Sequence, residues 1–289
     1  MCDVAILRHA YAEELRAFAR LRSDALVNAL ARVPRERFLG PGPWQIVVGA
    51  SRDSVHYRAT ADANPSHLYH DVLVAIDAAR CLNNGLPSGL AMWIDTLDLQ
   101  AGETVVHVGC GTGYYTAIMA DIVGSSGRVV AFEVDQLLAK NAQANLADWW
   151  PQVEVHARDG AALTVAGVDA IIINAGVTHI PRAWPHALRV GGRLLVPLTS
   201  SKTSDSIGIG AMFSITATPV GFRVRHVSPV AIFPCMGVRQ RDLNDELSRK
   251  LGPESRAVRS LRLDAHERDD SCWLHAPETC LSTLPVSVN

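Results

Sequence analysis

Residues 104–114 read TVVHVGCGTGY, and this stretch decides the fold class. Its first five residues are mostly apolar, which is typical of a short buried strand. Gly109, Gly111 and Gly113 follow, and the absence of side chains lets the backbone approach a ligand closely. A helix is expected over 112–123, and a helix N-terminus favours electron-rich groups. The stretch therefore predicts a strand, a glycine-rich turn and a helix that together bind a ligand.

The alternation of strand and helix continues to about residue 198. Further strands are expected at 127–132, 153–156 and 168–173, and helices at 136–149 and 181–188. Strands that alternate with helices are typical of βαβ units. The sequence therefore predicts an α/β protein with a doubly wound, mostly parallel sheet, as in Rossmann-like folds.

The segments on either side of this core divide the chain into three expected parts. Residues 12–33 carry an apolar stripe at helical spacing, and Pro87 with Ser88 suits the start of another helix. Later strands are expected at 208–212 and 222–230, and a helix at 245–251. We expect an N-terminal helical cap and substrate-side segment (1–88), a cofactor-binding core (89–235) and a C-terminal extension (236–289).

Composition excludes several classes of protein. The 289 residues are 48% hydrophobic and 19% charged, which is unlike a disordered chain. The formal net charge is −2, whereas proteins that bind nucleic acid through its phosphates need a basic surface. No apolar run approaches the roughly 18 residues of a membrane span. The N-terminal stretch has no basic region typical of a signal peptide, so we expect a cytoplasmic protein with no nucleic-acid or membrane partner.

Cysteine and histidine spacing predicts no metal site. The six cysteines form no C-x-x-C pair, and the closest two are Cys272 and Cys280. His67 and His70 are three apart, but no third ligand follows at a suitable spacing. We expect reduced thiols without disulfide bonds.

Two acidic residues define the expected cofactor. Glu133 ends the second strand, 20 residues beyond Gly113, where a carboxylate can accept hydrogen bonds from both ribose hydroxyls. Asp159 follows the third strand and can accept the exocyclic amine of adenine, or it can simply cap the next helix. The turn is G-x-G-x-G and lacks the third glycine of the dinucleotide motif. The pattern favours S-adenosylmethionine, with NAD as a distant alternative.

With these motifs the chain resembles the protein-L-isoaspartate O-methyltransferases, a family of class I S-adenosylmethionine-dependent methyltransferases. The resemblance rests on PRERF (34–38), LDLQAG (97–102), the Gly109 turn and GGRLLVP (191–197). It implies the Rossmann-like fold, S-adenosylmethionine and two sets of contacts. The cofactor would contact His107, Gly109, Cys110, Gly111, Gly113, Tyr114, Glu133, Val134, Asp159, Gly160 and Asn174. The substrate would contact Tyr69, Asp71, Asn83, Asn84, Ser88 and His179.

The sequence departs from the family at one functional position. Family members carry Ser-x-Pro before the helix that precedes the first core strand, and this serine lies at the isoaspartyl site. Here the corresponding residues are Gly85-Leu86-Pro87, so the hydroxyl is absent. Asn84 and Ser88 are candidates to replace it. His179, after the fourth core strand, is either a base or a loop histidine with a structural hydrogen bond.

The expected reaction is methyl transfer to a peptide or small-molecule carboxylate. A carboxylate is deprotonated near neutral pH, so this transfer needs no general base. One alternative is a natural-product O-methyltransferase that acts on a small molecule or a modified peptide. Another is a module that binds the cofactor without turnover. Arginines 223, 225, 239 and 241 either attract an anionic substrate or are solvated surface residues.

Overall fold

The computed structural model describes residues 3–50, 55–202 and 207–286. The chain divides into two compact units, which we describe separately. Unit 1 comprises Met1–Thr104 and Cys110–Arg158, and unit 2 comprises Val105–Gly109 and Asp159–Asn289. The division into the expected segments 1–88, 89–235 and 236–289 stays a prediction. No helix among the described residues is both long and apolar enough to cross a membrane.

Two helices replace the single N-terminal helix expected over 12–33. Helix α1 (Val4–Ala19) ends at Arg20, whose φ of 54° is left-handed and therefore incompatible with a continuing helix. The Ser23 hydroxyl then accepts from the Leu26 amide and begins α2 (Asp24–Arg32). The prediction of one continuous helix was wrong because periodicity alone does not reveal this break.

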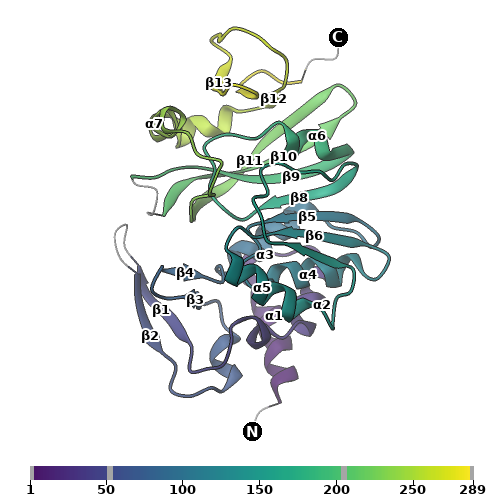
Figure 1. Ribbon diagram of the computed structural model, residues 1–289, viewed down its shortest axis with the longest axis vertical. Helices are drawn as coiled ribbons and strands as arrows, with labels where there is room; N and C mark the ends of the chain where they lie inside the picture. The colour runs from purple at the N-terminus through teal and green to yellow at the C-terminus, as the bar shows by residue number, and fades with distance from the viewer. Residues whose placement is uncertain (1–2, 51–54, 203–206, 287–289) are drawn as a thin grey trace. The chain divides into compact units, whose positions relative to one another are not determined.

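The remaining helices of unit 1 agree closely with the predicted ranges. They are α3 (Pro87–Leu97), α4 (Tyr114–Val123) and α5 (Gln136–Leu146). Two short 3-10 helices complete the list: η1 (Arg35–Phe38) follows α2, and η2 (Pro65–Leu68) precedes the residues expected to contact the substrate. Helix α2 packs against α4, and α1 packs against α2 and α3, so these helices form one cluster of unit 1 (Figure 1).

The strands of unit 1 form three pairs. Strands β6 (Arg128–Phe132) and β7 (Val153–His156) are parallel and pack against α4 and α5, as expected for βαβ units. Strands β1 (Gln45–Ala50) and β2 (Val55–Ala59) are antiparallel, as are the short β3 (Ala75–Asp77) and β4 (Leu82–Asn83).

Unit 2 begins with the central parallel strands. Strand β8 (Val168–Ile173) pairs in parallel with both β5 (Thr104–Val108) and β9 (Leu188–Ser200), after the short helix α6 (Ala183–Ala187). All residues of β8 except Asp169 are buried, as in a strand covered on both faces. The predicted α/β class is confirmed.

The C-terminal part of unit 2 is antiparallel, which makes the sheet mixed. Strands β10 (Gly208–Thr218) and β11 (Gly221–Ile232) extend the sheet beyond β9 and are longer than predicted (Figure 1). The tail then adds α7 (Arg241–Lys250), η3 (Pro253–Ala257), β12 (Ser260–Arg262), β13 (Cys272–His275) and β14 (Cys280–Ser282). The strand order β13-β14-β12-β11 shows that this tail continues the same sheet.

Candidate functional site

The glycine-rich turn requires glycine at the positions that the sequence predicts. Gly111 and Gly113 have φ values of 57° and 96°, a region that side chains rarely adopt. A Cβ on Gly113 would also lie 2.9 Å from Leu146 Cδ1. The amide of Gly113 donates to the carbonyl of Cys110 at 3.0 Å, which closes the turn directly before α4. The turn therefore presents bare backbone at the N-terminus of a buried helix.

Glu133 is held against this turn by two backbone amides. Its Oε2 accepts from the Gly111 amide at 2.8 Å, and its Oε1 accepts from the Asp135 amide at 3.0 Å. The residue is 8% exposed. Burial raises the pKa of its carboxyl, while these two hydrogen bonds oppose the rise. A carboxylate has about four acceptor positions, so two of them remain for a ligand diol.

The neighbours of Glu133 and of the turn differ in exposure. Val134, directly after Glu133, is 46% exposed and offers an apolar surface beside the carboxylate. Tyr114 is buried, and its ring lies 5.6 Å from Phe38 and 4.9 Å from Tyr115. Cys110 is buried, and burial raises the pKa of its thiol. Within unit 1 the structure therefore brings together the turn, Glu133 and Val134, and it places the Tyr114 side chain in the core.

Three of the expected cofactor residues lie within or directly after the parallel strands β5 and β8 of unit 2. Gly109 follows β5 with a φ of 79°, and a Cβ there would lie 3.2 Å from the Asn174 carbonyl oxygen. Asn174 follows β8, and its amide donates to the Val108 carbonyl at 2.8 Å. His107 is in the middle of β5, where burial lowers the pKa of the imidazole to about 3. His107 is therefore a neutral core residue at physiological pH.

Asp159 and Gly160 begin the second part of unit 2. The Asp159 Oδ1 accepts from the Ala161 amide at 2.9 Å. A Cβ on Gly237 would lie 2.4 Å from Asp159 Oδ2, so Gly237 packs directly against this carboxylate. The Gly160 carbonyl accepts from the Trp184 indole at 2.9 Å. Asp159 stabilises a local turn rather than capping a helix, and its side chain is exposed.

Arg35 positions the segment that carries Tyr69 and Asp71. Its buried guanidinium donates to the carbonyls of Leu68 and Val72, each at 2.7 Å. The adjacent Glu36 accepts from the Tyr69 hydroxyl. The resemblance in PRERF (34–38) does not by itself predict this role of Arg35. A charged side chain that is buried beside Phe38 needs polar partners, and the backbone carbonyls supply them.

Asp71 and Ser88, both of which are expected to contact the substrate, are joined by a hydrogen bond. The Asp71 Oδ1 accepts from the Ser88 amide at 2.8 Å. Leu86, the residue before α3, provides no side-chain cap, so Asp71 supplies an acceptor to the start of this helix. Both residues have a structural role that is sufficient to explain their positions.

Asn83 and Asn84 differ in how their amides are used. Asn83 accepts from the Tyr57 hydroxyl at 2.8 Å and donates to the Cys81 carbonyl at 3.0 Å. Asn84 is 8% exposed, and its buried Oδ1 has no hydrogen-bond partner among the described residues. A buried acceptor without a partner is costly to the fold and is often found where a ligand binds. Asn84 is therefore the strongest polar candidate on the substrate side of unit 1.

Gly85 occupies the family serine position in a conformation that disfavours serine. Its φ is 78°, and a Cβ there would lie 2.9 Å from Leu90 Cδ2 and 3.3 Å from Tyr115 Cε2. The Tyr115 hydroxyl donates to the Gly85 carbonyl at 3.3 Å. A serine at this position would therefore be strained both by the backbone conformation and by contact with Leu90 and Tyr115.

His179 lies in a hydrogen-bonded turn of unit 2. Its Nδ1 is 3.3 Å from the Thr178 hydroxyl, and burial lowers the pKa of its imidazole. Arg239 donates to the Gly176 carbonyl at 2.9 Å and to the Asn244 side chain at 2.7 Å. Arg239 is one of the four arginines expected either to attract an anionic substrate or to be solvated. Its guanidinium instead forms hydrogen bonds that stabilise the fold. Arg241 begins α7.

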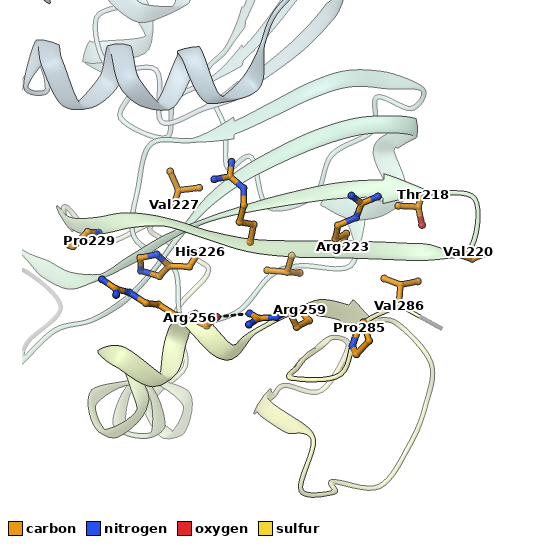
Figure 2. Close-up of a pocket in the computed structure, with 12 residues that line it drawn as sticks. Thr218, Val220, Arg223, His226, Val227, Pro229, Arg256, Arg259, Pro285 and Val286 are labelled. Carbon is orange, nitrogen blue, oxygen red and sulfur yellow. Dashed lines mark hydrogen bonds between the residues drawn. The ribbon is translucent and has the colours of Figure 1, made fainter. Parts of the chain in front are cut away.

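Arg223 and Arg225 line a cavity of about 850 Å³ in unit 2, together with Arg256, Arg259 and His226 (Figure 2). The Arg259 guanidinium donates to the Arg256 carbonyl, and none of the described lining residues is acidic. The cavity therefore has a basic wall, which suits an anionic ligand better than a cationic one.

Comparisons with known proteins agree with this arrangement. Residues 60–208 match the family model of protein-L-isoaspartate(D-aspartate) O-methyltransferase. A protein-L-isoaspartate O-methyltransferase of Ignicoccus hospitalis is 31% identical over 169 residues, which cover 57% of this chain and 77% of the relative. The Archaeoglobus fulgidus protein-L-isoaspartate O-methyltransferase 1 is 31% identical over 194 residues, or 66% and 79% of the two chains.

A solved structure is similar in fold. The protein-L-isoaspartate O-methyltransferase of Plasmodium falciparum in complex with S-adenosyl-L-homocysteine gives a TM-score of 0.60 at 17% identity. The match covers 79% of this chain and 97% of that one.

Proposed function

Since the chain belongs to the protein-L-isoaspartate O-methyltransferase family, we propose that it transfers a methyl group from S-adenosylmethionine to a carboxylate, with an isoaspartyl side chain in a peptide as the first candidate. The family relatives carry this activity in their names. The proposal depends on Glu133, Gly111 and Gly113, which would hold the cofactor.

The observation that carries the proposal is the placement of Glu133 against Gly111. The two backbone amides fix both carboxylate oxygens, so the side chain does not need to be ordered when a ligand binds. The remaining acceptor positions suit a vicinal diol such as that of ribose. Gly111 and Gly113 leave open backbone beside it, where a side chain would be strained. This donor and acceptor set fits the nucleoside part of S-adenosylmethionine.

Methyl transfer to a carboxylate requires that the acceptor be oriented toward the methyl group, and it does not require acid–base catalysis. S-adenosylmethionine supplies a methyl group on a positively charged sulfur. A carboxylate oxygen forms the new bond to the methyl carbon as the carbon–sulfur bond breaks, and the electron pair remains on sulfur. The acceptor is already deprotonated near neutral pH, so the chain needs to align it and exclude water. We assign part of this alignment to the Asn84 side chain, because its buried Oδ1 lacks a partner within the described residues.

Gly85 favours a second candidate function. Gly85 supplies no hydroxyl at the position where the resemblance implies a serine, and a serine side chain there would contact Leu90 and Tyr115 closely. This supports a natural-product O-methyltransferase that acts on a carboxylate or hydroxyl of a small molecule or modified peptide. Both candidates share the cofactor and differ in the acceptor.

A comparison of acceptors separates the two candidates. An isoaspartyl peptide and its ordinary aspartyl isomer would be incubated with labelled S-adenosylmethionine, and volatile methanol from the labile ester would be counted. Methanol release from the isoaspartyl peptide alone supports the first candidate. Cofactor binding without methanol release from either peptide supports the second and directs the search to other acceptors.

The location and the partners of the protein are further proposals. We propose a peptide or small-molecule carboxylate as the partner and the cytoplasm as the location, both as predictions from the sequence. Roles for Asp159, Asn174 and His179 in binding likewise stay predictions, which single substitutions test.

A further inference from the structure

Four side chains of unit 2 converge at the end of the C-terminal strands. They are His266, Cys272, His275 and Cys280, and their ligand atoms all lie within 4.8 Å of one another. Two are ring nitrogens and two are thiol sulfurs. Both cysteines are buried, with Cys280 only 1% exposed, and neither thiol forms a disulfide bond. Spacing along the chain predicts no metal site here, because the set contains no C-x-x-C pair and its histidines are nine residues apart.

The strand register explains how these residues meet. His275 of β13 lies directly opposite Cys280 of β14. Cys272 and His275 are three residues apart, so a regular strand would place them on opposite faces. The register shifts between Cys272 and Leu274, so β13 has one more residue here than β14. This extra residue places the Cys272 and His275 side chains on the same face of the sheet. His266 comes from the segment that joins β12 to β13.

Neighbouring groups orient the potential ligand atoms. His266 Nδ1 lies 2.9 Å from the Asp264 carbonyl, while its Nε2 lies 3.6 Å from Cys272 Sγ. A ring nitrogen that donates to a carbonyl leaves the other nitrogen available as a metal ligand. The Asp269 amide donates to Cys272 Sγ at 3.4 Å, an interaction that stabilises a thiolate.

The His275 ring provides a second, independent observation at this cluster. Its Nδ1 is buried and has no hydrogen-bond partner among the described residues. The ring lies edge-on to that of His266, with centroids 4.9 Å apart. A buried ring nitrogen without a hydrogen-bond partner, in a cluster with two thiols and a second imidazole, has the donor chemistry of a metal ligand.

We propose that His266, Cys272, His275 and Cys280 bind one zinc ion in a tetrahedral, structural site. Two thiolates and two imidazoles form a ligand set that zinc prefers, and four protein ligands leave no open position for catalysis. Ligand atoms around tetrahedral zinc lie about 3.3–3.8 Å apart, so pairs near the 4.8 Å limit close by about 1 Å on binding. Zinc forms four bonds, and the two thiol protons are released to solvent.

A zinc ion at this site would stabilise the C-terminal tail. Residues 263–271 contain no helix or strand, and β12, β13 and β14 are three or four residues long. Such short strands are marginal without additional support. Zinc would join the segment that carries His266 to both β13 and β14, so its removal is expected to loosen this end of unit 2.

Metal content tests the proposal directly. The full-length protein, reduced, loaded with zinc and dialysed, is expected to retain about one zinc per chain by mass spectrometry of the metal. Cys280→Ser and His275→Ala are expected to lower zinc affinity at least about tenfold. Cys235→Ser is the matched control, a buried cysteine elsewhere in unit 2 that is expected to keep the metal.

Cobalt gives a readout that does not depend on the variants folding. Cobalt bound to the wild-type chain is expected to show the visible bands of tetrahedral coordination and the near-ultraviolet bands of thiolate bonds. Retention of less than about 0.1 zinc per chain, octahedral cobalt spectra, or equal retention by Cys280→Ser would overturn the proposal. A Cys272–Cys280 disulfide in protein handled with zinc present would overturn it as well.

Discussion

The Gly111 amide donates a 2.8 Å hydrogen bond to Glu133 Oε2, which joins the glycine-rich turn to the end of the next strand. This contact links two residues that are 22 positions apart in the sequence. It fixes an acceptor beside open backbone, and it is the basis of the proposed nucleoside site.

Glu133→Ala is expected to weaken S-adenosylmethionine binding at least about tenfold, or about 1.4 kcal/mol. The substitution removes an acceptor that charge-assisted hydrogen bonds depend on, and it releases the Gly111 and Asp135 amides. Titration calorimetry measures the affinity. Glu154→Gln, an exposed glutamate of unit 1, serves as the control, and unchanged affinity in a folded Glu133→Ala protein would mean that the cofactor site is misplaced.

The affinity for S-adenosylmethionine is expected to fall as pH decreases. Burial raises the pKa of Glu133 above its ordinary value of 4.5, so protonation begins at a higher pH than for a free glutamate. The protonated form loses acceptor capacity, and binding therefore weakens on the acid side of the raised pKa. Calorimetry as a function of pH in wild type and Glu133→Gln checks this. Parallel pH profiles for the two proteins would rule out Glu133 as the titrating group.

Gly85→Ser is expected to destabilise the protein by about 1–2 kcal/mol and not to raise methylation of an isoaspartyl peptide above that of the wild type. The backbone there has a φ of 78°, and the new Cβ would meet Leu90 at 2.9 Å. Urea unfolding and the methanol assay measure both effects. Gly89→Ser is the matched control, because a Cβ there meets nothing within 4 Å and the change should be within about 0.5 kcal/mol.

Asn84→Ala is expected to reduce kcat/KM for methyl transfer while leaving stability nearly unchanged. Its Oδ1 has no partner to lose among the described residues, whereas Asn83 makes two side-chain hydrogen bonds. Asn83→Ala should therefore cost about 1–2 kcal/mol of stability. A large loss of stability in Asn84→Ala, with kcat/KM unchanged, would indicate a structural role instead.

Arg35→Ala is expected to cost at least about 2 kcal/mol of stability. The buried guanidinium holds the carbonyls of Leu68 and Val72, and these would lose their partner inside the protein. Urea unfolding measures the change, with the exposed Arg58→Ala as control. Equal stability of the two variants would show that the Tyr69 segment is held by other contacts.

The sequence predicts the fold where one local pattern is sufficient. The strands expected at residues 104–108, 153–156 and 168–173 are present in the structure with the same bounds. The break between α1 and α2 depends on the left-handed Arg20, which no hydrophobic pattern reveals. The short tail strands β12 to β14 are stabilised by pairing with distant segments, so local propensity does not identify them.

The candidate site also contains features that local sequence predicts and features that it does not. Glu133 and the glycine turn could be predicted because their chemistry depends on spacing along the chain. Three other features depend on tertiary contacts: the Asn84 Oδ1 without a partner among the described residues, the space at Gly85 that excludes a side chain, and the cluster that contains His266 and Cys280. Sequence spacing alone does not contain that information.

Calorimetric titration of the wild-type protein with S-adenosylmethionine, followed by Glu133→Ala under the same conditions, tests the central claim most directly. We expect saturable binding by the wild type and at least about tenfold weaker binding by the variant. The absence of binding by the folded wild-type protein would contradict the assignment of this chain as an S-adenosylmethionine-dependent methyltransferase.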